Sequence, residues 1–173
     1  RGLGDVYKRQ LEGLIDHTSE LRWLSVKGGG VGGHWSDVRS VSDIAPGPVP
    51  FLHTVDADMT AYRQGKTRKG SYAAYMDISH PDIMEFLTIR IPTGDVGRKC
   101  LNIPHAVNVS DEFMTAVEDD EDWNLIRRTD KSIHKKVKAK TDGVFGMQVN
   151  YQEKFGKRNF QKQEKLKFLD GFR

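Results

Sequence analysis

A glycine-bounded cationic loop is the stretch of this sequence best suited to contact a phosphate or a nucleotide. Gly65 and Gly70 enclose four residues, and three of these are the cations Lys66, Arg68 and Lys69. Glycine allows a backbone to approach a ligand closely, and the cations favour an anionic one. The sequence therefore predicts nucleotide contact at this loop.

The segments beside the loop predict a helix before it and a strand after it. Residues 51–62 carry apolar side chains at helical spacing, and residues 71–78 combine small and aromatic side chains with no charge before Asp77. Such a strand is typical of α/β proteins, in which both faces of the sheet are covered. We expect Ser79 to cap a following helix whose first turn contains Pro81.

Two glycine motifs of nucleotide-binding proteins are not fulfilled. The Gly-Lys-Thr at 65–67 has Thr60 where a P-loop needs its first glycine, and the order of helix and strand is reversed. Gly28, Gly30 and Gly33 fit G-x-G-x-x-G, but a helical pattern precedes them instead of a strand. We interpret this run as a strand or turn whose bare backbone touches another element or a ligand.

The remaining pattern predicts further alternation of helices and strands. Three prolines make residues 45–50 a loop, because proline disfavours helix interiors and central strands alike. Apolar spacing adds a helix at 11–26, a strand at 101–109, a helix that starts near Asp111 and a short strand at 123–126. This alternation is that of α/β architecture.

Residues that could bind a metal or act as nucleophiles are scattered. The six histidines show neither H-x-x-x-H nor H-E-x-x-H spacing, and Cys100 has no second cysteine and no recognisable base beside it. We interpret Cys100 as a bystander and the histidines as surface or packing residues. The sequence predicts no metal site.

Composition limits the class of protein. The chain has 173 residues, 37% of them hydrophobic and 29% charged, which suits one domain with a core. No apolar run approaches the roughly 18 residues of a membrane span, and no stretch has the features of a signal peptide. We therefore expect a cytoplasmic protein without membrane contact.

Both ends of the chain differ from its middle. Residues 1–10 resemble a translated adapter sequence, so we interpret them as non-native. Residues 131–173 hold 12 Lys and Arg against 4 Asp and Glu, a charge of +8, which leaves −5 for residues 1–130. Their phenylalanines follow no helix or strand period, and we predict a basic tail that is disordered or non-native.

The basic tail also raises an alternative function, a nucleotide- or nucleic-acid-binding module. Clustered positive charge attracts the phosphate backbone. The tail nevertheless lacks aromatic residues interleaved on a recognisable platform. Binding of dATP or dTTP, compared with binding of single-stranded DNA, would separate the two kinds of function.

The motifs, taken in order, resemble one family, the large catalytic (alpha) subunit of ribonucleotide reductase, nearest the aerobic class I enzymes. The resemblance covers residues 11–126, and the family's subunit is several times longer, so the chain is expected to be a fragment. The matching segments are Gly28–Gly32 with Asp37 and Arg39, Val49–Phe51, Gln64–Gly70 with Tyr75 and His80–Asp82, and Arg98 with Asn102.

The resemblance implies an α/β fold, a partial segment of the family's ten-stranded α/β barrel, with residues 11–130 as its N-terminal part. It also implies reduction of ribonucleotides by a cysteine thiyl radical. The radical comes from a separate metal-containing small subunit, the large subunit forms a homodimer, and dNTP or ATP effectors regulate it. No catalytic residue of the family falls within this chain, which should be inactive alone and needs no cofactor of its own.

The resemblance assigns contact residues instead. Its substrate-binding residues are Gly30, Gln64 and Arg68, and its effector-binding residues are Arg39, Gly65, Lys66, Thr67, Lys69 and Gly70. A planar guanidinium such as that of Arg68 can stack on a base and also hydrogen-bond to it.

The segment at 44–48 departs from the family, whose neighbouring effector loop is usually longer and often carries a further basic residue. Here it reads Ile-Ala-Pro-Gly-Pro and is uncharged. The resemblance therefore leaves effector affinity and specificity open.

Overall fold

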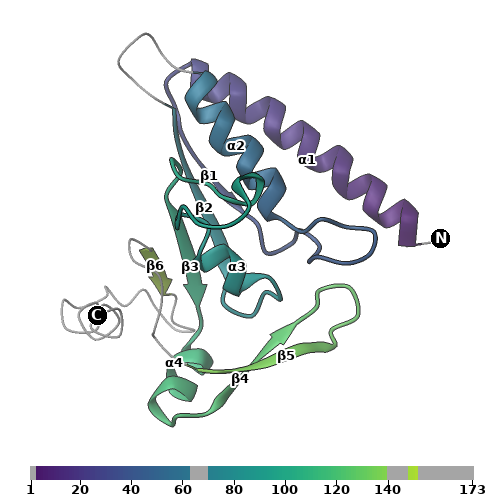
Figure 1. The fold of residues 1–173 in the computed structure, drawn as a ribbon, viewed down its shortest axis with the longest axis vertical. Coiled ribbons are helices and arrows are strands. Elements are labelled where there is room, and N and C mark those ends of the chain that lie inside the picture. Colours follow the sequence, from purple (N-terminus) through teal and green to yellow (C-terminus); the bar gives the residue numbers. More distant parts are fainter. Residues whose placement is uncertain (1–2, 63–69, 140–147, 152–173) are drawn as a thin grey trace.

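A computed structural model describes residues 3–62, 70–139 and 148–151 of the chain (Figure 1). Its main element is a four-stranded sheet in the order β1-β2-β3-β6, in which every neighbouring pair is parallel. The strands are β1 (Gly30–His34), β2 (Ser71–Asp77), β3 (His105–Val109) and β6 (Gln148–Tyr151). The α/β prediction is confirmed, and the sheet is open, as expected of one segment of a barrel.

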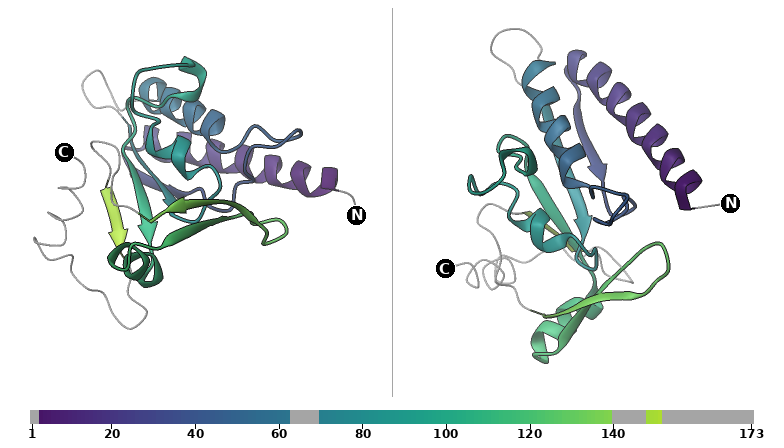
Figure 2. Two further views of the ribbon diagram at one scale, coloured as in Figure 1. Left: turned by 60° about the horizontal axis from the view of Figure 1, so that its bottom comes forward. Right: turned by 45° about the vertical axis from the view of Figure 1, so that its right-hand side comes forward.

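Two helices, α1 (Leu3–Val26) and α2 (Val49–Ala61), lie side by side along one face of the sheet (Figures 1 and 2). The first contains the predicted helix at 11–26 but begins at Leu3, inside the segment interpreted as an adapter. The second begins two residues before the prediction, because Pro50 stands in the first turn, where its missing N–H needs no partner.

Shorter elements complete the described chain. They are α3 (Ile83–Leu87), the 3₁₀-helix η1 (Val96–Arg98), α4 (Asp111–Glu118) and the antiparallel hairpin β4 (Asp122–Ile126) with β5 (Ile133–Lys138). Ser110 caps α4 by accepting the Phe113 amide at 3.3 Å. None of the described helices is long and apolar enough to cross a membrane.

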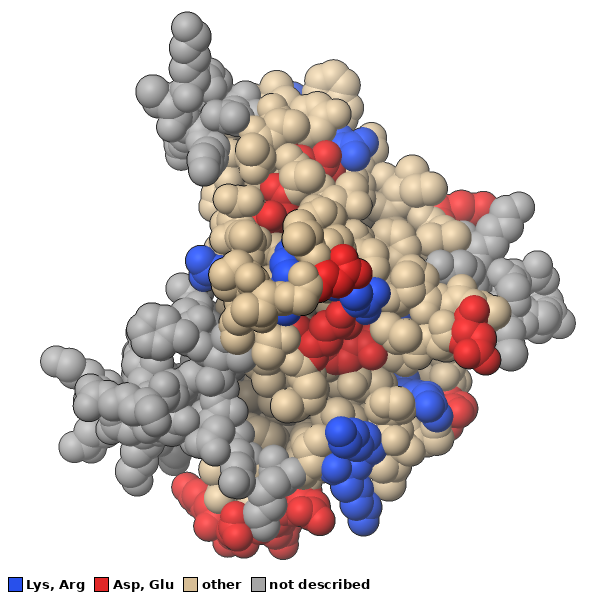
Figure 3. Space-filling view, in the orientation of Figure 1, with Lys and Arg blue, Asp and Glu red and all other residues tan. Residues whose placement is uncertain are grey.

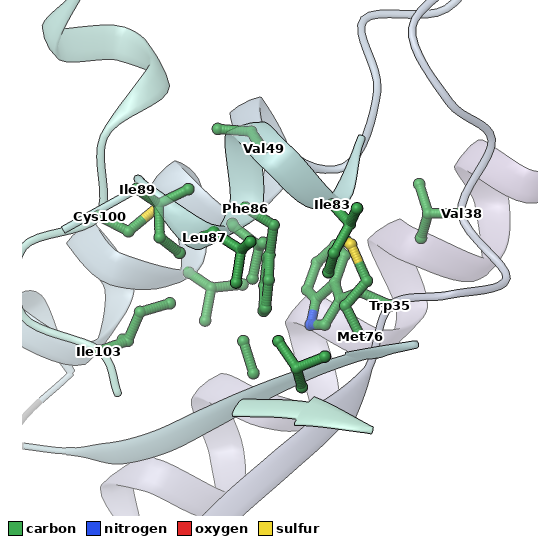
Figure 4. Close-up of a cluster of buried hydrophobic side chains, with 14 of the residues drawn as sticks. Trp35, Val38, Val49, Met76, Ile83, Phe86, Leu87, Ile89, Cys100 and Ile103 are labelled. Carbon is green, nitrogen blue, oxygen red and sulfur yellow. The ribbon is translucent and has the colours of Figure 1, made fainter. Parts of the chain in front are cut away.

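The core lies between the sheet and the helices. From β2 the side chains of Tyr72, Ala74 and Met76 are buried, whereas Ala73 and Tyr75 on the opposite face are only half-buried. The prediction of a strand buried on both faces is therefore correct for one face. Figure 4 shows the cluster, which includes Trp35, Val49, Ile83, Phe86 and Ile103.

The predicted cap of the third helix is wrong. Asp82, not Ser79, is the residue before α3, and it makes no side-chain capping bond. The Asp82 amide instead donates to Nδ1 of His80 at 3.1 Å, and the Ile83 amide donates to the His80 carbonyl oxygen at 3.1 Å. Ser79 accepts the Ile126 amide through its backbone oxygen at 2.8 Å, so it links the hairpin to the sheet.

The basic tail contains secondary structure that the sequence does not predict. Strand β5 pairs with β4, and β6 pairs with β3 over four residues. Ala139 at the end of the hairpin is 2% exposed. That residues 1–10 are non-native, and that residues 131–173 are non-native or disordered, stays a prediction.

Candidate functional site

Polar side chains of three neighbouring strands meet at the carboxyl edge of the sheet. Nε2 of His34 and Nδ2 of Asn108 each lie 3.1 Å from Oδ1 of Asp77, and the Asp77 amide donates to Oγ of Ser36 at 2.7 Å. Burial disfavours the charged carboxylate, but the hydrogen bonds outweigh it and lower the pKa of Asp77. The carboxylate therefore stays ionised at neutral pH and fixes the three strand ends together.

The turn of the β4–β5 hairpin lies beside this edge and forms two pockets with it. The smaller, of about 170 Å³, lies between the strand ends at Ser36 and Asp77 and the turn residues Arg128 and Lys131. The larger, of about 480 Å³, is lined by residues 39–44. Arg127 lines both pockets.

Arg39, a predicted effector ligand, lines the larger pocket and is half-buried. It follows β1, so it lies near the carboxyl edge. The same pocket contains Asp43 and, from the hairpin, Arg127 and Thr129. Arg127 is therefore a second cation in the pocket that contains Arg39, although it lies 88 positions later in the chain.

Gly30, a predicted substrate contact, lies at the opposite, amino edge of the sheet. It is paired with Ser71, the residue that follows Gly70. A Cβ at Gly30 would meet no atom of the described structure within 4 Å, so its backbone borders open space. The structure therefore brings Gly30 and Gly70 together and places Arg39 away from both.

The remaining predicted contact residues lie outside the described residues. Both ends of their loop are nevertheless fixed: the Ser25 hydroxyl donates to the Tyr62 carbonyl oxygen at 2.7 Å, and the Gly70 amide donates to the Met59 carbonyl oxygen at 3.2 Å. The side chains that stay predictions are those of Gln64, Lys66, Thr67, Arg68 and Lys69, together with Gly65.

No group of three or more potential metal ligands occurs among the described residues. Cys100 is fully buried, and burial raises the pKa of its thiol to about 12, with the nearby Asp56 adding to the shift. A thiol with such a pKa is protonated and unreactive at neutral pH. The interpretation of Cys100 as a bystander agrees with this environment.

Sequence reasoning missed Asp77 and Arg127 as parts of a site. A signal for Asp77 was available: His34, Asp77 and Asn108 are polar residues at the ends of predicted strands, and carboxyl ends of parallel strands share one edge. No comparable signal exists for Arg127, because its approach to Arg39 depends on how the hairpin folds back onto the sheet.

Comparison with known proteins agrees with this architecture. The sequence matches the family described as "Ribonucleotide reductase, barrel domain" over residues 3–168. The chain belongs to this family. An open parallel sheet with helices on one face is what a segment of such a barrel domain provides.

Two similar proteins are named as large subunits of ribonucleoside-diphosphate reductase. The chain is 67% identical over 116 residues to the putative ribonucleoside-diphosphate reductase large subunit of Frog virus 3, which covers 67% of this chain and 20% of that protein. It is 43% identical over 129 residues to the large subunit of Invertebrate iridescent virus 6, covering 70% of this chain and 13% of that protein. The chain thus spans about a fifth or less of the length of these relatives.

A third relative differs in its name. It is the vitamin B12-dependent ribonucleoside-diphosphate reductase of Thermoplasma acidophilum, 30% identical over 138 residues, which are 75% of this chain and 17% of that protein. None of these three names describes a nucleic-acid-binding protein, so the alternative function gains no support.

Proposed function

We propose that this chain is a segment of a ribonucleoside-diphosphate reductase large subunit, which reduces ribonucleotides to deoxyribonucleotides. The observation that carries the proposal is the match to the reductase barrel domain over residues 3–168. Within the subunit, the segment contacts substrate and effector and leaves the radical chemistry to other parts of the protein.

The amino edge of the sheet is the proposed substrate side. No described atom lies within 4 Å of where a Cβ would stand at Gly30. Gly70, which follows the segment that carries Gln64 and Arg68, lies beside Gly30. A bare backbone lets a ribonucleotide approach closely. Arg68 and Gln64 then supply the donors and acceptors that distinguish one base from another.

The effector proposal needs a second copy of the chain. Arg39 lies beyond the carboxyl end of β1 and Gly70 at the amino end of β2, and a five-residue strand alone separates these edges by about 17 Å. One effector can contact both Arg39 and the loop at 65–70 most simply when the loop comes from a partner subunit. Exposed apolar side chains on α1, Ile15 at 67% and Trp23 at 67%, support a homodimer.

The radical source is proposed to be a separate metal-containing small subunit. The relative with 67% identity is named as a large subunit, which implies a smaller partner, whereas the B12-dependent relative is only 30% identical. A cytoplasmic location stays a prediction.

A chimeric subunit tests the proposal. Residues 11–139 of this chain replace the corresponding part of the Frog virus 3 relative, and the chimera is assayed for CDP reduction with that virus's small subunit. We expect turnover by the chimera and none by the 173-residue chain alone. An inactive but folded chimera, or turnover by the chain alone, would contradict the assignment.

A further inference from the structure

The turn of the β4–β5 hairpin contributes a cation to the pocket that contains Arg39, and nothing in the family resemblance assigns it a role. The pocket has a volume of about 480 Å³ and lies between residues 39–44 and the turn residues Arg127 and Thr129. This volume is within the roughly 300–1,000 Å³ typical of sites for small organic ligands. Figure 3 shows Lys and Arg side chains gathered over the hairpin, apart from the acidic group near α4.

The fold fixes the hairpin turn against the segment that carries Arg39. Arg128 forms an ion pair with Asp37, two residues before Arg39. At the base of the turn the Ile126 amide donates to the Ser79 carbonyl oxygen at 2.8 Å. Arg127 therefore faces the pocket from a defined position.

Hydrogen bonds within the turn hold its own shape. The Arg127 amide donates to the Ser132 carbonyl oxygen at 2.9 Å, and the Lys131 amide donates to the Arg127 carbonyl oxygen at 3.0 Å. The Ser132 hydroxyl donates a hydrogen bond to Oδ1 of Asp130 at 2.7 Å. The backbone of Arg127 is thus ordered before any ligand arrives, which reduces the entropy that binding costs.

The guanidinium of Arg127 has donors left for a ligand. Its Nη2 atom lies 3.0 Å from Nδ1 of His134, and because a guanidinium only donates, the imidazole nitrogen accepts. A guanidinium has five N–H donors, so the bond to His134 leaves other donors for a phosphate. Arg39 and Arg127 outnumber Asp43 among the charged residues that line the pocket, which favours an anion.

We propose that Arg127 binds the phosphates of the effector nucleotide together with Arg39. The hairpin thereby supplies the second cation that the short, uncharged segment at 44–48 does not carry. This inference rests on the proposed effector role of Arg39. Arg127 is a binding residue of the regulatory site and takes no part in reduction.

Effector binding to the chimeric subunit tests the role of Arg127. Calorimetry measures the affinity for dTTP and for inorganic tripolyphosphate. The chimera without further substitution, called the wild type here, is compared with Arg127→Ala, Arg127→Gln and Arg39→Ala. We expect each variant to weaken binding of both probes by about tenfold or more, the effect of losing one charge-assisted hydrogen bond. Lys136→Ala, which removes an exposed cation of the same hairpin that lines neither pocket, is the matched control and should bind like the wild type.

The outcomes separate this inference from the proposed function. Binding that falls with Arg39→Ala but not with either Arg127 variant overturns the role of Arg127 and leaves the effector site standing. An equal loss with Lys136→Ala also overturns it, because the hairpin then acts only through its general positive field. A wild-type chimera that reduces CDP but binds neither probe refutes the effector site itself.

Discussion

The indole N–H of Trp35 donates to the hydroxyl oxygen of Tyr72 at 2.8 Å, and both side chains are almost completely buried. Nε2 of His17 lies 3.3 Å from the same hydroxyl oxygen. Burial raises the pKa of Tyr72 to about 12, so the hydroxyl keeps its proton and can donate it to His17. This contact joins α1, β2 and the end of β1, and it passes directly over Gly33.

Gly33→Ala should destabilise the fold. The new Cβ would collide with the Tyr72 hydroxyl, 2.9 Å from Tyr72 Cζ and 3.2 Å from the Trp35 indole nitrogen. Overpacking of this kind costs about 1–3 kcal/mol. The check is the thermal midpoint of the chimeric subunit. Gly13→Ala, on α1 with no described atom near the new Cβ, is the control: it should raise the free energy of unfolding by up to about 1 kcal/mol and so raise the midpoint slightly. Equal midpoints for the two variants would contradict the role of Gly33.

Gly30→Ala should not lower stability and should impair substrate binding. A Cβ there meets no described atom within 4 Å, and alanine is better tolerated in strands than glycine. If the substrate approaches this backbone, the added methyl group raises KM in the chimera while the thermal midpoint does not fall. Unchanged KM values for CDP, UDP, ADP and GDP would show that the substrate does not contact Gly30.

Asp56→Ala should be among the most destabilising changes on α2. The buried carboxylate accepts the amides of Asn102 and Ile103 at 2.9 and 2.8 Å and the Asn102 side-chain amide at 3.0 Å. Removing it leaves these donors without their partner, which costs about 2–4 kcal/mol in total. Asp56→Asn keeps one oxygen acceptor and should lose about half as much. Thermal melts of both variants provide the measurement, and equal losses would contradict the expectation that one neutral oxygen acceptor preserves part of the stability.

Stability should fall between pH 6.5 and pH 4 partly because of His105. The side chain is 1% exposed, its ring packs edge-on against Phe86 with the centroids 5.2 Å apart, and burial lowers its pKa to about 4. Because the folded-state pKa lies below that of the unfolded chain, the unfolded state binds the proton first as the pH falls. The stability lost through this proton uptake is on the order of a few kcal/mol.

The variant His105→Leu removes this titration. It should lose less stability between pH 7 and pH 5 than the wild type does, as read from urea midpoints of the chimera at the two pH values. The buried His80, whose pKa is also lowered by desolvation, keeps part of the dependence in both proteins. Identical pH dependence of the variant and the wild type would exclude His105 as a contributor.

The elements that sequence could predict are those specified by near neighbours. Ser110 before Asp111 predicts the start of α4, and the glycine run predicts a strand or turn where β1 lies, because capping and close approach depend on a few adjacent residues. The start of α3 is missed because the His80 ring and carbonyl oxygen accept the amides that Ser79 was expected to satisfy. That competition depends on where the imidazole lies in the folded core.

Long-range pairings could not be predicted from local pattern. Strand β6 lies in a lysine-rich, weakly periodic stretch and exists through its pairing with β3. The two cations Arg39 and Arg127 likewise line one pocket because β4 and β5 fold back toward the carboxyl edge of the sheet. The family resemblance could supply Arg39 but could not indicate its neighbour on the hairpin.

Arg68→Ala in the chimeric subunit should change which nucleotide is reduced more than it lowers the overall rate. The loop that carries Arg68 runs between two fixed points, the Ser25 bond to the Tyr62 carbonyl oxygen and the Gly70 bond to the Met59 carbonyl oxygen. A loop with fixed ends can change conformation without disturbing the sheet.

An effector shifts such a loop only through its different affinity for the two conformations, and typical couplings are roughly 1–3 kcal/mol. Removing the guanidinium should erase much of this coupling and should affect less the radical step, which the proposed function assigns to other parts of the subunit. Competition assays with mixed CDP, UDP, ADP and GDP, run with each effector in turn, measure the product ratios. Arg68→Lys is the control for charge alone, because it keeps the positive charge and removes the planar guanidinium. Product ratios in Arg68→Ala that match the wild type would reject the sensing role, because a residue that reads the base cannot be removed without changing the choice of base.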